Sequence, residues 1–239
     1  YLFRYEYNMV RFLECEGYDV SYCTDIDTHR RGALIQNHRE FLVVGHDDYW
    51  SDEMRTSVTA ARDAGVILGF FSANDCYWQI RLGASTLHAN EPDRTIVAWK
   101  EAYAQDPFYT DQDTSNDHLV TNEWRLSPVN NSEDALIGVM YGADPVDADI
   151  VIDDVTSASW VFAGPGLASG STIPGLLGYE VDNIQSLSPL PIPLLGPSPF
   201  PPTTTNAPPN TTHFTTVPPP AAPTWDPASP TAPHPVAPA

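Results

Sequence analysis

Hydrophobic and polar residues follow two different periods over the first hundred residues. Apolar positions at helical spacing predict helices at 6–16, 25–35 and 51–65, the last with Ser51 as its N-cap. Short runs rich in β-branched and aromatic residues predict strands at 18–23, 41–45, 66–71 and 95–99. Strands that alternate with helices at this spacing predict a doubly wound α/β domain, with a mostly parallel sheet covered on both faces.

The pattern weakens in the second half of the chain. Residues 101–160 are loop-like and acidic, and 161–180 are rich in glycine, with short apolar runs that could form late strands. After Gln185 come 18 of the 24 prolines, mixed with threonine and alanine. Such a segment buries too little apolar surface to offset the entropy of ordering it. We therefore expect an α/β domain over 1–185 and a disordered, extended tail over 186–239.

The charge of the chain is strongly negative. There are 31 Asp and Glu residues against 11 Lys and Arg residues, which gives a formal net charge of −20. This field repels phosphate backbones and anionic lipids, so we expect no nucleic-acid partner. No apolar run approaches the ~18 residues of a membrane span, and the three cysteines lack zinc-site spacing. A structural explanation of the charge is that the protein is secreted or salt-adapted and has an acidic surface.

The densest polar cluster follows the predicted strand 41–45. His46, Asp47, Asp48 and Tyr49 lie just beyond its carboxyl end, where open α/β sheets bind their ligands. Carboxylate and phenol oxygens suit Fe(III), Mn or Mg, and a neutral histidine can pass a proton near pH 7. The alternative is structural, because the same side chains can bond loop amides and help to cap the following helix.

Three further positions offer suitable chemistry. Tyr5 and Tyr7 flank a carboxylate before the first helix, Asn74 follows the third strand and could hold an oxyanion, and Glu180 follows a glycine-rich approach. The structural alternatives are packing for the two tyrosines, backbone hydrogen bonding for Asn74 and surface solvation for Glu180. The sequence lacks G-x-S-x-G, a phosphate-binding loop and a dinucleotide fingerprint. These absences count against serine hydrolysis, nucleotide hydrolysis and hydride transfer.

Several short motifs occur together and in a fixed order over residues 1–185. They are Tyr5-Glu6-Tyr7, Gly45-His46-Asp47-Asp48-Tyr49-Trp50-Ser51, Arg62-Asp63-Ala64-Gly65-Val66, Phe70-Phe71-Ser72-Ala73-Asn74 and Gly178-Tyr179-Glu180-Val181-Asp182. This joint pattern resembles the C-terminal domain of the N,N-dimethylformamidase large subunit. The resemblance implies a class I glutamine-amidotransferase-like, flavodoxin-like fold. As partners it implies a small amide substrate, and it leaves upstream domains, a small subunit and an oligomer open.

The resemblance also implies hydrolysis of the amide C–N bond at a mononuclear iron held by two tyrosines and a glutamate. Carried over by motif, Glu180 is the general base, and His46 and Asn74 position the substrate or stabilise the oxyanion. Asp48 stands where the family has its iron-binding glutamate, and Tyr5 or Tyr7 is the one tyrosine ligand that this sequence offers.

Asp48 is one methylene shorter than glutamate, so its carboxylate reaches roughly 1.5 Å less far. Metal ligation tolerates only about ±0.2 Å, so iron would be lost or bound differently unless the backbone shifts. The alternative hypothesis is therefore a non-catalytic binding or structural module with the same fold, in a larger multidomain protein, secreted or not. The shorter Asp48, the missing second tyrosine and the stalk-like tail favour this alternative.

Overall fold

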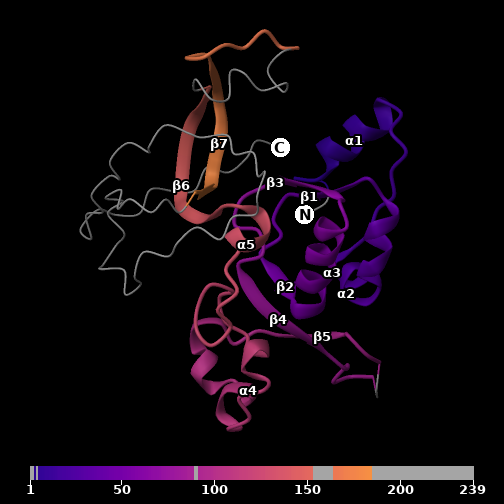
Figure 1. Cartoon of the computed structure of the whole chain (residues 1–239), viewed down its shortest axis with the longest axis vertical. Coiled ribbons are helices and arrows are strands. Elements are labelled where there is room, and N and C mark those ends of the chain that lie inside the picture. The colour runs from indigo at the N-terminus through magenta and orange to yellow at the C-terminus, as the bar shows by residue number, and fades with distance from the viewer. Residues whose placement is uncertain (1–2, 4, 89–90, 153–163, 185–239) are drawn as a thin grey trace, which may run out of the picture.

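A computed structural model of the chain describes residue 3 and residues 5–88, 91–152 and 164–184 (Figure 1). The expected tail at 186–239 lies outside the described residues. None of the described helices is long and apolar enough to cross a membrane. The elements, in chain order, are α1 (Tyr7–Cys15), α2 (Asp25–Arg31), η1 (Gly32–Asn37), β1 (Glu40–Val44), β2 (Tyr49–Ser51), α3 (Asp52–Asp63), β3 (Ile67–Phe71), β4 (Trp78–Gly83), β5 (Thr95–Val97), η2 (Lys100–Gln105), α4 (Pro107–Thr110), η3 (Asp117–Leu119), α5 (Asp134–Ile137), β6 (Met140–Val151) and β7 (Thr172–Asn183).

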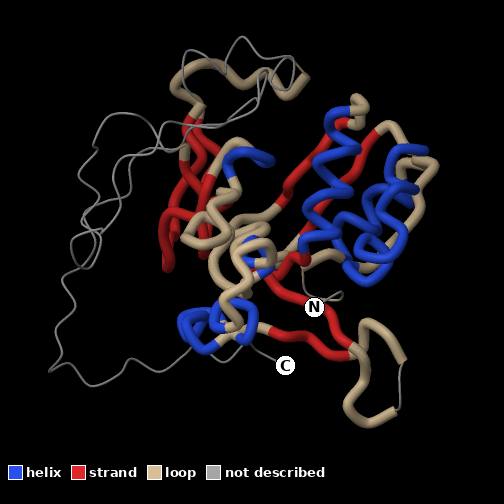
Figure 2. Tube along the Cα trace, turned by 60° about the horizontal axis from the view of Figure 1, so that its bottom comes forward, coloured by secondary structure: helices blue, strands red, loops and turns tan. Residues whose placement is uncertain are grey.

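The described strands form three small sheets. Strands β1 and β3 form a parallel pair, β2-β4-β5 is a mixed sheet with one parallel and one antiparallel pairing, and β6-β7 is an antiparallel ribbon. The expected doubly wound parallel sheet, and with it the expected class I glutamine-amidotransferase-like, flavodoxin-like fold, is therefore wrong for the described part of the chain. In Figures 1 and 2 the helices α1, α2 and α3 gather on one side, and the long β6-β7 ribbon stands on the other.

The physical reason for this error lies in strand pairing. The parallel strands β1 and β3 and the helix between them were predicted, but residues 18–23 form no strand, and Tyr18 and Tyr22 are exposed. The predicted strand at 95–99 is the short β5, and it pairs antiparallel with β4. Alternation and β-propensity favour an extended backbone without specifying its partner. Local pattern alone therefore could not give the sheet order.

Helix α3 fixes the centre of the core. The Ser51 hydroxyl accepts a hydrogen bond from the Met54 backbone N–H at 3.2 Å, as the sequence predicted for an N-cap. Acidic residues occupy the first turn and Arg62 the last, which suits the helix dipole. The inward face of α3 contributes Met54, Val58 and Ala61 to one buried cluster. The same cluster includes Ile35, Val43, Trp50, Val66 and Trp124 from other segments. This packing holds the carboxyl end of β1 in place.

The β6-β7 ribbon brings the end of the described chain back to the carboxyl end of β1. Its two strands of 12 residues pair antiparallel with several register shifts. At its base the Asp182 carboxylate accepts a hydrogen bond from the Asn74 backbone N–H at 2.8 Å, just after β3. The base of the ribbon is thereby tied to the β1-β3 pair, and Glu180 is carried to the end of β1.

Candidate metal centre

A glycine turn at the end of β1 positions the first candidate residues. Gly45 has a φ of +83°, in the left-handed region that favours glycine, and a Cβ there would lie 3.0 Å from Tyr5 Cβ. The loop that follows is held by its backbone. Asp47 O accepts from Cys76 N at 2.9 Å, and Asp48 O accepts from Trp78 N at 2.7 Å. The side chains of His46 and Asp48 are therefore presented from a fixed loop.

Three side chains of types that can bind a metal ion converge at this loop. His46, Asp48 and Glu180 each offer one ligand atom, and these atoms lie within 4.8 Å of one another. His46 Nδ1 is 3.4 Å from Glu180 Oε2 and 4.0 Å from Asp48 Oδ1. Both of these carboxylate oxygens are buried, and neither has a hydrogen-bond partner among the described residues. One imidazole and two carboxylates form a donor set that suits a divalent or trivalent first-row metal ion.

The electrostatics of the cluster are unfavourable without a cation. Burial raises the pKa of Asp48, and the charges of His46 and Lys100 oppose that rise. Burial also raises the pKa of Glu180, and the negative charge of Asp48 adds to the effect. Two partly buried carboxylates that repel each other would both be stabilised in the ionised form by a positive ion between them.

A cleft of about 310 Å³ opens beside the cluster, and it is lined by Tyr5, His46, Asp48, Tyr49 and Tyr179. The Tyr5 ring lies edge-on to the His46 ring, with 4.8 Å between the ring centroids. The Tyr179 hydroxyl is 3.2 Å from His46 Nε2. The volume is at the small end for ligand sites, so it fits a ligand of few atoms.

The structure places the remaining predicted site residues as follows. Asn74 is buried, and its Nδ2 donates to Glu180 Oε1 over a long 3.5 Å. Tyr5 reaches the cleft. Tyr7 lies on α1 with a 43 % exposed side chain, packed on Phe3 and beneath Arg11. The structure thus brings Tyr5, Asn74 and the three metal-ligating side chains together and leaves Tyr7 outside the cleft.

Sequence reasoning missed Tyr179 and Asp182 at this site. Both fall in the motif that contains Glu180, and the period of two along a strand places Glu180 and Asp182 on one face of β7. Burial raises the pKa of Asp182 to about 6, and the hydrogen bond from Asn74 opposes that rise. The strand period was therefore a usable signal for Asp182, whereas nothing local pointed to Tyr179.

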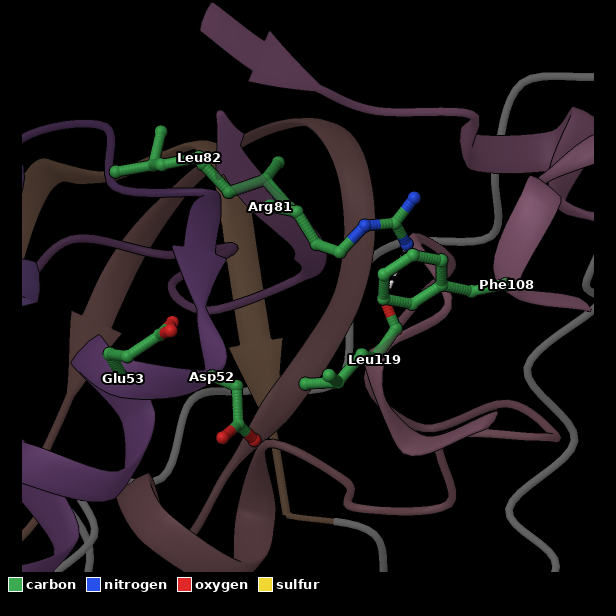
Figure 3. A pocket seen from close by; sticks show the side chains of 7 residues that line it. Asp52, Glu53, Arg81, Leu82, Phe108 and Leu119 are labelled. Atoms are coloured by element: carbon green, nitrogen blue, oxygen red, sulfur yellow. Dashed lines mark hydrogen bonds between the residues drawn. The ribbon is translucent and has the colours of Figure 1, made fainter. Parts of the chain in front are cut away.

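A second cavity of about 200 Å³ lies elsewhere, lined by Asp52, Glu53, Ile80, Arg81, Leu82, Phe108 and Leu119 (Figure 3). The Arg81 guanidinium stacks on the Phe108 ring, 3.9 Å from its centroid. It also makes two hydrogen bonds to the buried Asp106 carboxylate. Because the charge of Arg81 is already neutralised, this cavity offers less chemistry than the cleft at His46.

Comparison with known proteins agrees with the motif resemblance. A family model described as "N,N-dimethylformamidase beta subunit-like, C-terminal" matches residues 1–224 of the chain. The match includes both the loop after β1 and the β6-β7 ribbon, which supply the clustered side chains. A search of curated proteins found no match.

Proposed function

Because the chain belongs to the N,N-dimethylformamidase beta subunit-like C-terminal family, we propose that it carries the metal site of a hydrolase that cleaves the C–N bond of small linear amides. The convergence of His46, Asp48 and Glu180 on one point is the observation that carries this proposal. An ion would bind at Asp48 Oδ1 and Glu180 Oε2, the two buried oxygens that have no hydrogen-bond partner among the described residues.

These residues fit the iron that the family resemblance implies. His46, Asp48 and Glu180 would hold the ion, with the Tyr5 phenol beside them as a further oxygen donor. In this proposal His46 and Glu180 complete the donor set around the shorter Asp48 side chain. When bound, such an ion supplies Lewis acidity, which polarises a carbonyl group and lowers the pKa of water.

The remaining steps fall to side chains of the chain. Asn74 donates toward Glu180 Oε1, and we assign to it the orientation of the amide carbonyl of the substrate. With Glu180 Oε2 at the ion, we assign the other carboxylate oxygen, Oε1, to accept a proton from the attacking water. Tyr179 contacts the imidazole of His46 and would fix its orientation.

Metal content and amide turnover test the proposal directly. The purified chain, incubated with Fe(II) and desalted, should retain one ion and release amine from N,N-dimethylformamide or ammonia from formamide. Asp48→Asn and Glu180→Gln should each weaken metal binding by at least about tenfold, the lower end of the effect of removing groups around a metal. The matched control is Asp63→Asn, an exposed carboxylate at the end of α3 that pairs only with Arg62 among the described residues.

Two outcomes would contradict the proposal. Equal metal retention by wild type and Asp48→Asn would remove the assigned site. Metal binding without turnover of any small amide would reject the hydrolase and support the alternative, a binding or structural module with the same fold.

A further inference from the structure

Lys100 is the only lysine of the sequence, and it contacts a residue that lines the cleft beside His46. Lys100 Nζ donates to the Tyr49 hydroxyl at 3.2 Å, and Tyr49 lines the cleft. We propose that Lys100 and the Tyr49 hydroxyl bind a carboxylate of the substrate, so that the site selects small amides that carry an anionic group. This inference rests on the proposed function and adds the substrate class to it.

The ammonium group of Lys100 has hydrogen-bond donors to spare, although its charge also acts on Asp48. An ammonium group has three donors, and the Tyr49 hydroxyl is the one hydrogen-bond acceptor found for Lys100 among the described residues. No carboxylate of the described chain lies within 4.0 Å of Lys100 Nζ, although the sequence has 31 acidic residues. A cation with free donors beside a cleft is therefore available to an anionic ligand.

The side chain of Lys100 is held in a fixed position. Lys100 Nζ lies over the Trp78 ring, 4.6 Å from its centroid, and 5.5 Å from the centroid of Tyr49. Both aromatic faces attract the cation. The Lys100 backbone N–H donates to Thr121 O at 3.0 Å, and the neighbouring Trp99 N–H donates to Thr121 Oγ1 at 2.9 Å. Holding the ammonium in place lowers the entropy cost of binding a ligand.

The carboxylates at the cleft give the surroundings of Lys100 a negative charge. Asp48 and Glu180 line or flank the cleft and would repel an anionic substrate. Among the described residues, Lys100 is the lysine or arginine whose contacts reach the residues that line the cleft, so it offers an anion a positive side chain besides the proposed ion. One ammonium and one hydroxyl match the two oxygens of a single carboxylate, whereas phosphate groups are usually held by more donors.

A single-lysine label allows a direct test. In the full chain grown with ¹³C-lysine, every lysine signal in an NMR spectrum reports Lys100. N-formylglycine and its neutral counterpart N-formylglycinamide are titrated into the same sample. N-formylglycine should shift the Lys100 ε-CH₂ signal and bind about tenfold more tightly or better, because hydrogen bonds to charged groups are the stronger ones. Equal affinity for the two amides, or an unmoved Lys100 signal, would overturn the inference.

Variants separate this anion site from the hydrolase proposal. Lys100→Met should bind the two amides equally, and Lys100→Arg, which keeps the charge, should retain the preference for N-formylglycine. A preference that survives in Lys100→Met would also overturn the inference. Because binding is measured without turnover, a preference in a chain that retains no metal would reject the proposed hydrolase while supporting the anion site.

Discussion

The carboxylate of Asp48 is the single group on which the metal assignment depends most. Its Oδ1 is buried beside His46 and has no hydrogen-bond partner in the described part of the chain. A buried carboxylate oxygen left without a partner is costly unless a ligand satisfies it. Glu180 approaches the same point from the ribbon, so an ion bound here would meet a second carboxylate besides the shorter Asp48.

Asp106 offers a test of residue energetics away from the cleft. It is fully buried and accepts hydrogen bonds from Arg81, Phe108 N and Thr121. Burial alone would raise the pKa of Asp106, but these bonds lower it to about 2. Since the folded-state pKa lies below the unfolded value, the stabilisation is complete above about pH 4 and is lost as the pH falls toward 2.

Asp106→Asn should therefore lower the free energy of unfolding by about 2 kcal/mol or more near pH 7, and by clearly less near pH 2.5. Urea denaturation of wild type and variant at the two pH values measures this difference. Asp63→Asn, at an exposed site, should cost little at either pH. An equal loss for Asp106→Asn at both pH values would contradict the assigned role of its charge.

Among the elements, the turn after β1 connects the fold to the site most directly. Gly45 takes a left-handed φ, and a Cβ added there would lie 3.0 Å from Tyr5 Cβ. Gly65, after α3, has a φ of +95° with nothing within 4 Å of a Cβ added there. Gly45→Ala and Gly65→Ala should each cost about 1 kcal/mol of stability through the backbone.

Gly45→Ala alone should also displace Tyr5 from His46 and weaken metal binding about tenfold. Titration calorimetry with the metal, beside thermal unfolding of both variants, separates the two effects. If Gly65→Ala weakened metal binding as much as Gly45→Ala, the effect would be one of general stability, and the role given to the turn would be wrong.

The same elements show what the sequence could predict. Helix α3 and the strands β1 and β3 were predicted, whereas the short strand β2 was not, because Ser51 caps the helix and the apolar stripe of α3 is local. The pairing of β5 with β4 and the β6-β7 ribbon depend on contacts between distant segments, and local pattern does not encode them. His46 and Asp48 stood out for their position after a strand. Glu180 needed its family motif, and Lys100 needed the structure, because only folding brings it to Tyr49.

At the scale of the whole molecule, the net charge of −20 should make stability depend on salt. Repulsion among like charges weakens the folded state, and salt screens it over distances near 10 Å at about 0.1 M. Raising sodium chloride from about 10 mM to about 0.5 M should raise the melting temperature by roughly a few degrees. Sucrose at matched osmolality controls for effects unrelated to charge. A melting temperature that stayed constant or fell with salt would contradict this account of the charge.

The central claim is that one ion binds between the β1 loop and the β7 strand, and anomalous diffraction tests it most directly. A crystal grown with Fe(II) and measured at the iron absorption edge should give a single strong peak. The peak should lie about 2.0–2.2 Å from a ring nitrogen of His46 and from carboxylate oxygens of Asp48 and Glu180. An anomalous map without a peak at these three residues, or with its peak elsewhere on the molecule, would contradict the claim.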